Sequence, residues 1–141
     1  MDHLPESKVS QDDLEEVRKV YLVLIGFVPP RISARTDLMS RLDPEGLLLQ
    51  EQVRRHFMYP PCLDVKTAQL MLFGMLLMNL QDAARLHAIA ARRAGATWEE
   101  LGAVVGLAFL FRGLSASNVG SQVIQEIAAS ERDKRDTGGK A

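Results

Sequence analysis

The chain has 141 residues, a formal net charge of −1 and a single cysteine, Cys62. This length favours one domain, and hydrophobic residues make up 47% of the chain, enough for a core. A nearly neutral charge provides no field that would attract nucleic acid or an anionic membrane surface. One cysteine excludes a disulfide framework within the chain, so a reducing cytoplasm is the simplest compartment.

No membrane-spanning or secretory segment is expected. The N-terminal residues MDHLPESKVSQDD are polar and acidic, unlike a secretory signal. The longest apolar runs, Leu70–Met78 and Ala103–Phe111, are far shorter than the roughly 20 residues that a bilayer span needs. We therefore expect a cytoplasmic protein without a membrane or nucleic-acid partner.

The first half of the chain predicts a flexible arm over residues 1–9 and then three helices. Ser10 with the acidic residues after it indicates the first helix start, and Pro29-Pro30 indicates its end. Ser33 is a plausible cap for a short second helix, and Asp43 before a proline indicates the third. The predicted helices cover residues 10–25, 33–42 and 44–57.

The second half predicts four more helices, because apolar residues recur at helical spacing between clear start signals. Asp64 indicates the first start, Thr97 with Glu100 forms a capping box, and Ser115 precedes the last helix. The predicted helices cover residues 64–79, 80–94, 98–111 and 116–131. Residues 132–141 are charged and predicted to be a flexible tail. No alternating strand pattern occurs, so we expect an all-α domain of six to seven helices over residues 10–131.

Two of these predicted helices contain segments that are apolar on every side: LMLFGMLLM at 70–78 and GAVVGLAFLF at 102–111. A helix of this kind must be buried all round, and a small domain has difficulty enclosing two of them. A homo-oligomer is the economical solution, because neighbouring copies cover what one subunit exposes. The alternative is that the other helices wrap both within the monomer.

His87 is the residue that points most directly to chemistry. Ala83 and Ala84 precede it by one turn, and Ala90 and Ala91 follow it by one turn, so all share a helix face. The small side chains allow another helix or a small molecule to approach the imidazole. The alternative is a core histidine that hydrogen-bonds to a backbone carbonyl.

The segment His87–Leu101, HAIAARRAGATWEEL, followed by FRGLSASN at 111–118, resembles the carboxymuconolactone decarboxylase family, which belongs with the alkyl hydroperoxidase D-like folds. LIGFVPPRI at 24–32 and LDVKT at 63–67 resemble earlier landmarks of that family. The resemblance covers about residues 20–130. It implies an alkyl hydroperoxidase D-like helical bundle that forms a trimer or a hexamer.

Departures from the family pattern favour its decarboxylase branch. The peroxidase branch carries a Cys-x-x-Cys pair before the histidine, and those positions here hold Leu80 and Ala83, so a thiol peroxidase role is disfavoured. That branch also has a glutamate about one helix length earlier, where this chain has Ala68 and Gln69. The decarboxylase branch lacks the cysteines, keeps the histidine and tends to have an acidic residue where Asp82 stands.

The resemblance implies a carboxy-lyase that acts on a small carboxylated lactone or ring in the breakdown of aromatic compounds. His87 would move the proton, Arg112 or Arg85 would hold the substrate carboxylate, and Asp82 and Asn118 would support them. No metal or cofactor is expected, because the substrate itself can act as the electron sink. Other roles stay open: a surface ion pair for Asp82 and Arg85, a helix-end cation for Arg112 and a cap for Asn118. A protein of the same fold that only binds a small acid, or only assembles, is the alternative.

Overall fold

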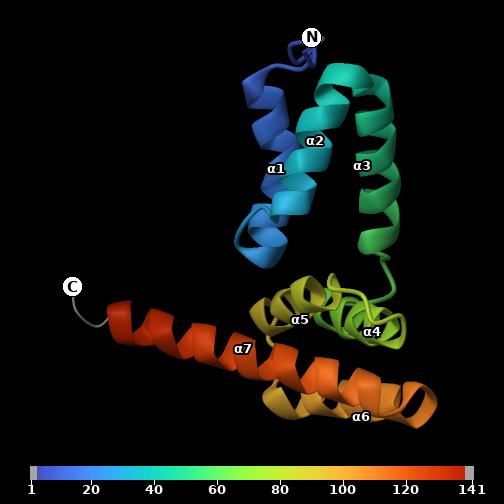
Figure 1. The fold of residues 1–141 in the computed structure, drawn as a ribbon, viewed down its shortest axis with the longest axis vertical. Helices are drawn as coiled ribbons and strands as arrows, with labels where there is room; N and C mark the ends of the chain where they lie inside the picture. The colour runs from blue at the N-terminus through green and yellow to red at the C-terminus, as the bar shows by residue number, and fades with distance from the viewer. Residues whose placement is uncertain (1–2, 139–141) are drawn as a thin grey trace. The chain divides into compact units, whose positions relative to one another are not determined.

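The computed structural model describes residues 3–138, and within that range it contains seven helices and no strand. The predicted all-α class is thus confirmed. The helices group into two compact units, Met1–Pro61 and Cys62–Ala141, and each unit is described by itself (Figure 1). A single domain over residues 10–131 stays a prediction.

Unit 1 contains helices α1, α2 and α3, which lie side by side (Figure 1). The predicted caps are confirmed: the side chain of Ser10 accepts from the backbone N–H of Asp13, and that of Asp43 from the N–H of Gly46. Helix α1 ends at Gly26, whose φ of 94° favours glycine. The helices span Gln11–Ile25, Pro30–Leu42 and Pro44–Met58.

The predicted start of the second helix was wrong by one turn. Helix α2 begins at Pro30, not after Ser33, and Pro29 precedes it in an extended conformation. A proline is well suited to the first helical position, because its missing N–H has no intrahelical partner there. Pro29 is therefore the last residue of the segment that connects α1 to α2, and Pro30 is the first residue of α2.

Residues 3–9 lie outside the helices, yet part of this predicted arm is attached to α2. The backbone N–H of Lys8 donates to the carbonyl of Ser40 over 2.9 Å, and the Ser7 hydroxyl lies 3.0 Å from that of Ser40. The other predicted arm residues, 1–2, lie outside the described residues, as do residues 139–141 of the predicted tail.

Unit 2 contains helices α4 to α7 and the buried core that surrounds the alanines of α5. Helix α4 packs against α5 and α6, and α6 and α7 run antiparallel side by side (Figure 1). The predicted Asp64 cap and the Thr97–Glu100 capping box are both confirmed. The helices span Val65–Met78, Ala84–Arg93, Trp98–Arg112 and Leu114–Gly138.

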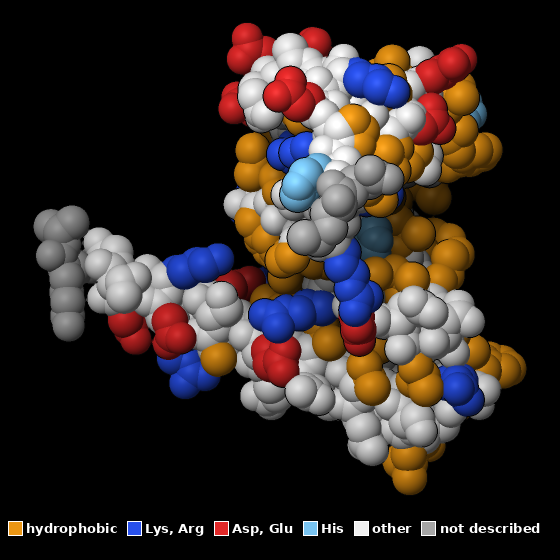
Figure 2. All heavy atoms as spheres, turned by 45° about the horizontal axis from the view of Figure 1, so that its top comes forward, with side chains coloured by type: hydrophobic (Ala, Val, Ile, Leu, Met, Phe, Trp, Pro, Cys, Tyr) orange, Lys and Arg blue, Asp and Glu red, His pale blue; other side chains and the backbone are white. Residues whose placement is uncertain are grey.

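Two boundaries in unit 2 differ from the prediction. Helix α5 begins at Ala84 instead of residue 80, because Leu80 adopts a φ of 51° and turns follow it. Helix α7 begins at Leu114, directly after Gly113, and continues to Gly138. Residues 132–138, predicted as part of a loose tail, are therefore helical. Figure 2 shows acidic and basic side chains gathered over this end of α7.

Candidate functional site

The imidazole of His87 contacts the side-chain amide of Gln69 on the neighbouring helix. Nδ1 of His87 on α5 lies 2.7 Å from Oε1 of Gln69 on α4. Gln69 is 0% exposed, whereas His87 is half-buried. The polar pair lies between two helices that pack closely against each other, so the protein fixes the ring through a buried partner.

The alanines around His87 are used for helix packing. Ala84, Ala88 and Ala91 are buried in one cluster that also contains Phe73 of α4 and Ala116 of α7. Small side chains allow helix backbones to approach closely, and here neighbouring helices occupy the space that the sequence left open. The approach of another helix, one of the two uses proposed for the alanine face, is thus observed for Ala84 and Ala91.

Arg85 forms an ion pair with a residue of another helix. Nη1 of Arg85 lies 2.9 Å from Oε2 of Glu126 on α7. Asp82 lies in the turn before α5 and is exposed, and its backbone carbonyl accepts from the N–H of Arg85. Arg85 therefore links α5 to α7.

Arg112 and Asn118 lie on either side of the break between α6 and α7. Nε of Arg112 donates to the backbone carbonyl of Met78, at the end of α4, over 3.0 Å. Carbonyls in the last turn of a helix lack intrahelical donors, so this bond is stabilising in itself. Asn118 is exposed and is the fifth residue of α7, past the position of an N-cap. Both arginines of the predicted site thus have structural partners.

Gln69 is the residue that the sequence interpretation missed. In the sequence this position is notable only because the glutamate of the peroxidase branch is absent from positions 68 and 69. One signal was available: Gln69 is a polar side chain within α4, whose following residues, 70–78, are all apolar apart from glycine. A buried polar group requires a partner, and an amide can supply one without charge.

A second cluster, also missed, fixes the joint between α5 and α6. The guanidinium of Arg92 lies 2.9 and 3.1 Å from the two carboxylate oxygens of Glu131 and 3.8 Å from the ring centroid of Trp98. It also donates to the carbonyl of Ala96. These contacts hold the pKa of the Glu131 carboxyl below its usual value. The joint that resembles the family is therefore stabilised by one arginine.

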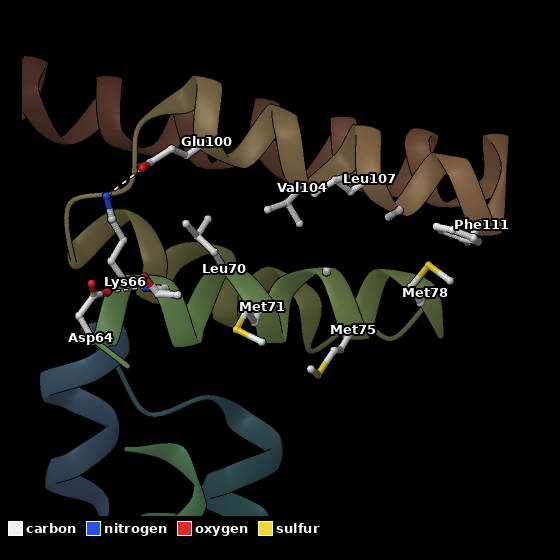
Figure 3. Close-up of a pocket in the computed structure, with 13 residues that line it drawn as sticks. Asp64, Lys66, Leu70, Met71, Met75, Met78, Glu100, Val104, Leu107 and Phe111 are labelled. Atoms are coloured by element: carbon white, nitrogen blue, oxygen red, sulfur yellow. Dashed lines mark hydrogen bonds and ion pairs between the residues drawn. The ribbon is translucent and has the colours of Figure 1, made fainter. Parts of the chain in front are cut away.

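An apolar groove of about 640 Å³ lies between α4 and α6. Figure 3 shows Met71 and Met78 from α4 and Val104, Leu107 and Phe111 from α6 along it. At one end the ammonium of a lysine lies 2.8 Å from a glutamate carboxylate, and the pair consists of Lys66 and Glu100. The groove therefore has an apolar wall and one charged end.

Unit 1 contains a buried polar cluster that periodicity could not reveal. The hydroxyl of Tyr21 donates to Oε1 of Glu51 over 2.8 Å, and Arg35 pairs with the same carboxylate. Burial is the main cause that raises the pKa of Tyr21 to about 12. Glu51 and the exposed His56 also line a cavity of about 410 Å³.

No family model, curated protein or solved structure matches this chain. In residues 3–138 no helix combines the length and apolar content that a membrane crossing requires. Over the same residues no cluster of three or more His, Cys, Asp or Glu side chains is placed to hold a metal ion. The resemblance to the decarboxylase family therefore stays a hypothesis that rests on the sequence.

Proposed function

We propose that the chain is a cofactor-independent carboxy-lyase similar to the carboxymuconolactone decarboxylases, acting on a small carboxylated lactone or ring compound. The observation that carries the proposal is the imidazole of His87, held by Gln69 through a 2.7 Å contact. A histidine titrates near neutral pH, so an oriented ring can both give and accept a proton.

The chemistry requires few groups. Loss of CO₂ beside an unsaturated lactone leaves negative charge spread over the ring and its carbonyl, and one proton must then return to carbon. His87 would return it. Arg112 is the better candidate to hold the substrate carboxylate, because only its Nε is used by Met78, whereas Arg85 is already paired with Glu126.

The test compares lactone turnover by the wild type and by His87→Ala, with His56→Ala as the matched control on the exposed surface of α3. We expect His87→Ala to lower kcat by about 10²- to 10⁴-fold, the usual contribution of a general acid or base. His56→Ala should retain full activity. Equal rates from wild type and His87→Ala would remove His87 from the mechanism and refute the proposal.

A second proposal, assembly with further copies of the chain, is supported by the outer surface of α6. This apolar face consists of four large side chains that are 64–85% exposed: Leu107, Leu110 and Phe111 of α6 and Leu114, the first residue of α7. With Met71 and Met75 from the groove wall, and taking about 150–200 Å² for a fully exposed large side chain, they expose roughly 700 Å². This exceeds the 300–600 Å² of a typical monomer's largest apolar patch and approaches the roughly 800 Å² per partner of a stable interface.

A second copy is the partner that this face suits. A small ligand in the groove would cover Leu107 and Phe111, which line it, but would leave Leu110 and Leu114, which do not. A second copy presents the same apolar area, as a two-fold interface requires. A purely assembling or acid-binding protein of this fold is the alternative to the lyase. It would be recognised by a carboxylate that raises the melting temperature without being consumed.

The oligomer is tested by measuring the molar mass in solution for the wild type and for Leu110→Lys. We expect an oligomer for the wild type and a smaller species for the variant. Leu48→Lys replaces a comparably exposed leucine of unit 1 and serves as the control. A wild type that is monomeric at tens of micromolar would contradict the assembly. A thiol peroxidase is not proposed, because the only cysteine cannot form an internal disulfide.

A further inference from the structure

We infer that Gln69 is a positioning residue that holds neutral His87 in the tautomer protonated at Nδ1, so that Nε2 is the nitrogen that accepts and returns the proton. The catalytic meaning of this inference rests on the proposed lyase. The tautomer of His87 does not depend on the proposed lyase, and it can be measured without a substrate.

The two atoms in contact identify the hydrogen-bond donor. The amide oxygen of Gln69 is an acceptor, and it lies 2.7 Å from Nδ1 of His87. A hydrogen bond over that distance needs a proton between the two atoms, and only Nδ1 can supply it. In a neutral imidazole one nitrogen carries the proton and the other carries the lone pair, so Nε2 is the basic nitrogen.

The orientation of the amide is supported from its other side. Gln69 is 0% exposed, and no buried side-chain nitrogen or oxygen among residues 3–138 lacks a hydrogen-bond partner. The NH₂ group of Gln69 is therefore bonded too, and its partner must be an acceptor because NH₂ only donates. A reversed amide would place its oxygen against that acceptor. Leaving buried polar groups mismatched in this way costs about 1–3 kcal/mol each.

In water, neutral histidine carries its proton mainly on Nε2. The contact with Gln69 favours the other tautomer, so the proton is on Nδ1 and the lone pair is on Nε2, on the side of the ring away from Gln69. An outer partner that fixes the tautomer and ring direction is a common way to prepare a histidine for its role. Gln69 orients the ring without placing a negative charge beside it.

The measurement is the pair of ¹⁵N chemical shifts of each imidazole, recorded on the labelled full-length chain at alkaline pH where the histidine signals no longer change. His87→Gln and His56→Gln assign the signals by their loss. For His87 we expect a protonated Nδ1 and an unprotonated Nε2. Exposed His56 provides the reference and should show the averaged shifts of a ring that exchanges between tautomers. A His87 ring protonated at Nε2 would overturn the inference.

Substitutions at Gln69 test its role directly. Gln69→Met keeps the side-chain length and removes the acceptor, so the His87 shifts should move toward the averaged values, and kcat should fall by about 10-fold or more with little change in KM. Gln69→Leu also removes the acceptor and should move the His87 shifts in the same direction. Gln81→Met removes an exposed amide and should change nothing. Unchanged His87 shifts in a folded Gln69→Met or Gln69→Leu protein would remove Gln69 from the role, and if neither variant folds, the wild-type spectrum decides the tautomer.

The two proposals fail in different ways. An Nδ1–H ring in a protein that turns over no lactone leaves the positioning role intact and refutes the lyase. Turnover that depends on His87, combined with an Nε2–H ring, leaves the lyase intact and refutes the positioning role.

Discussion

Gly120 of helix α7 faces Val105 of α6 and Leu77 of α4 at short distance, so Gly120→Ala should destabilise the protein. A Cβ atom at this position would lie 2.6 Å from Cγ2 of Val105 and 3.1 Å from Cδ1 of Leu77. Optimal carbon–carbon contacts are about 3.5–4.0 Å. Val105 and Leu77 are both buried, and a valine has few alternative rotamers, so the contact cannot be relieved by a simple side-chain rotation.

Two opposing terms set the size of the effect. Overpacking of a filled core costs about 1–3 kcal/mol, and the short distance to a branched side chain places Gly120 toward the upper end. Replacement of glycine by alanine inside a helix stabilises by about 1 kcal/mol. The free energy of unfolding should therefore fall by about 1–2 kcal/mol, which is a large part of a typical domain's stability.

The assay is urea unfolding followed by circular dichroism, with Gly102→Ala as the control. Gly102 is also a helical glycine, on α6, but an added Cβ there meets nothing within 4 Å. Gly102→Ala should therefore stabilise by about 0.5–1 kcal/mol. All proteins are compared at one concentration, because association adds to apparent stability. A Gly120→Ala protein as stable as the wild type would show that α6 and α7 are not packed this closely.

Two further predictions concern pH. Arg92 lowers the pKa of Glu131 from its usual 4.5, so this carboxylate stabilises the fold above about pH 4.5, and the contribution is lost as the pH falls through the lower folded value. The difference in unfolding free energy between wild type and Glu131→Gln should thus shrink in acid. The pKa of Tyr21 is raised from 10.0 to about 12, so its contribution is complete below pH 10 and is lost between about pH 10 and 12. An alkaline absorbance titration should show one tyrosine ionising near 12, and Tyr21→Phe should remove that signal and the matching loss of stability.

Features that depend on neighbours in the sequence were predictable. Ser10, Asp43, Asp64 and Thr97 all cap helices as expected, because a cap joins a side chain to a backbone N–H only two or three residues away. Helical periodicity and the absence of alternation were enough for the all-α class. These signals are local, but not every one of them was right: Ser33 and Ser115, also predicted as caps, lie inside α2 and α7.

The predicted helix boundaries were wrong where the sequence allowed a residue more than one structural role. A double proline both ends one helix and begins the next, and the sequence alone does not say which proline does which. Leu80 gave no warning of its left-handed φ of 51°, since bulky residues rarely adopt that conformation. The start of α5 therefore shifted from residue 80 to Ala84.

Partners far apart in the sequence were beyond prediction. Arg85 and Glu126 are 41 residues apart, and Arg92 and Glu131 are 39 apart, so nothing in the local pattern joins them. The sequence selected His87 by its alanine neighbours and by a family resemblance. It could not show that the alanines face other helices.

The amide opposite His87 explains how a polar pair can occupy the interface between α4 and α5. A carboxylate at position 69 would be stripped of water in a fully buried place, which costs several kcal/mol even after relaxation. A neutral amide with both ends bonded avoids most of that cost. The glutamate of the peroxidase branch is absent from positions 68 and 69. In the proposed lyase Gln69 would still direct the imidazole, because a proton-returning step requires the direction of the ring rather than a second charge.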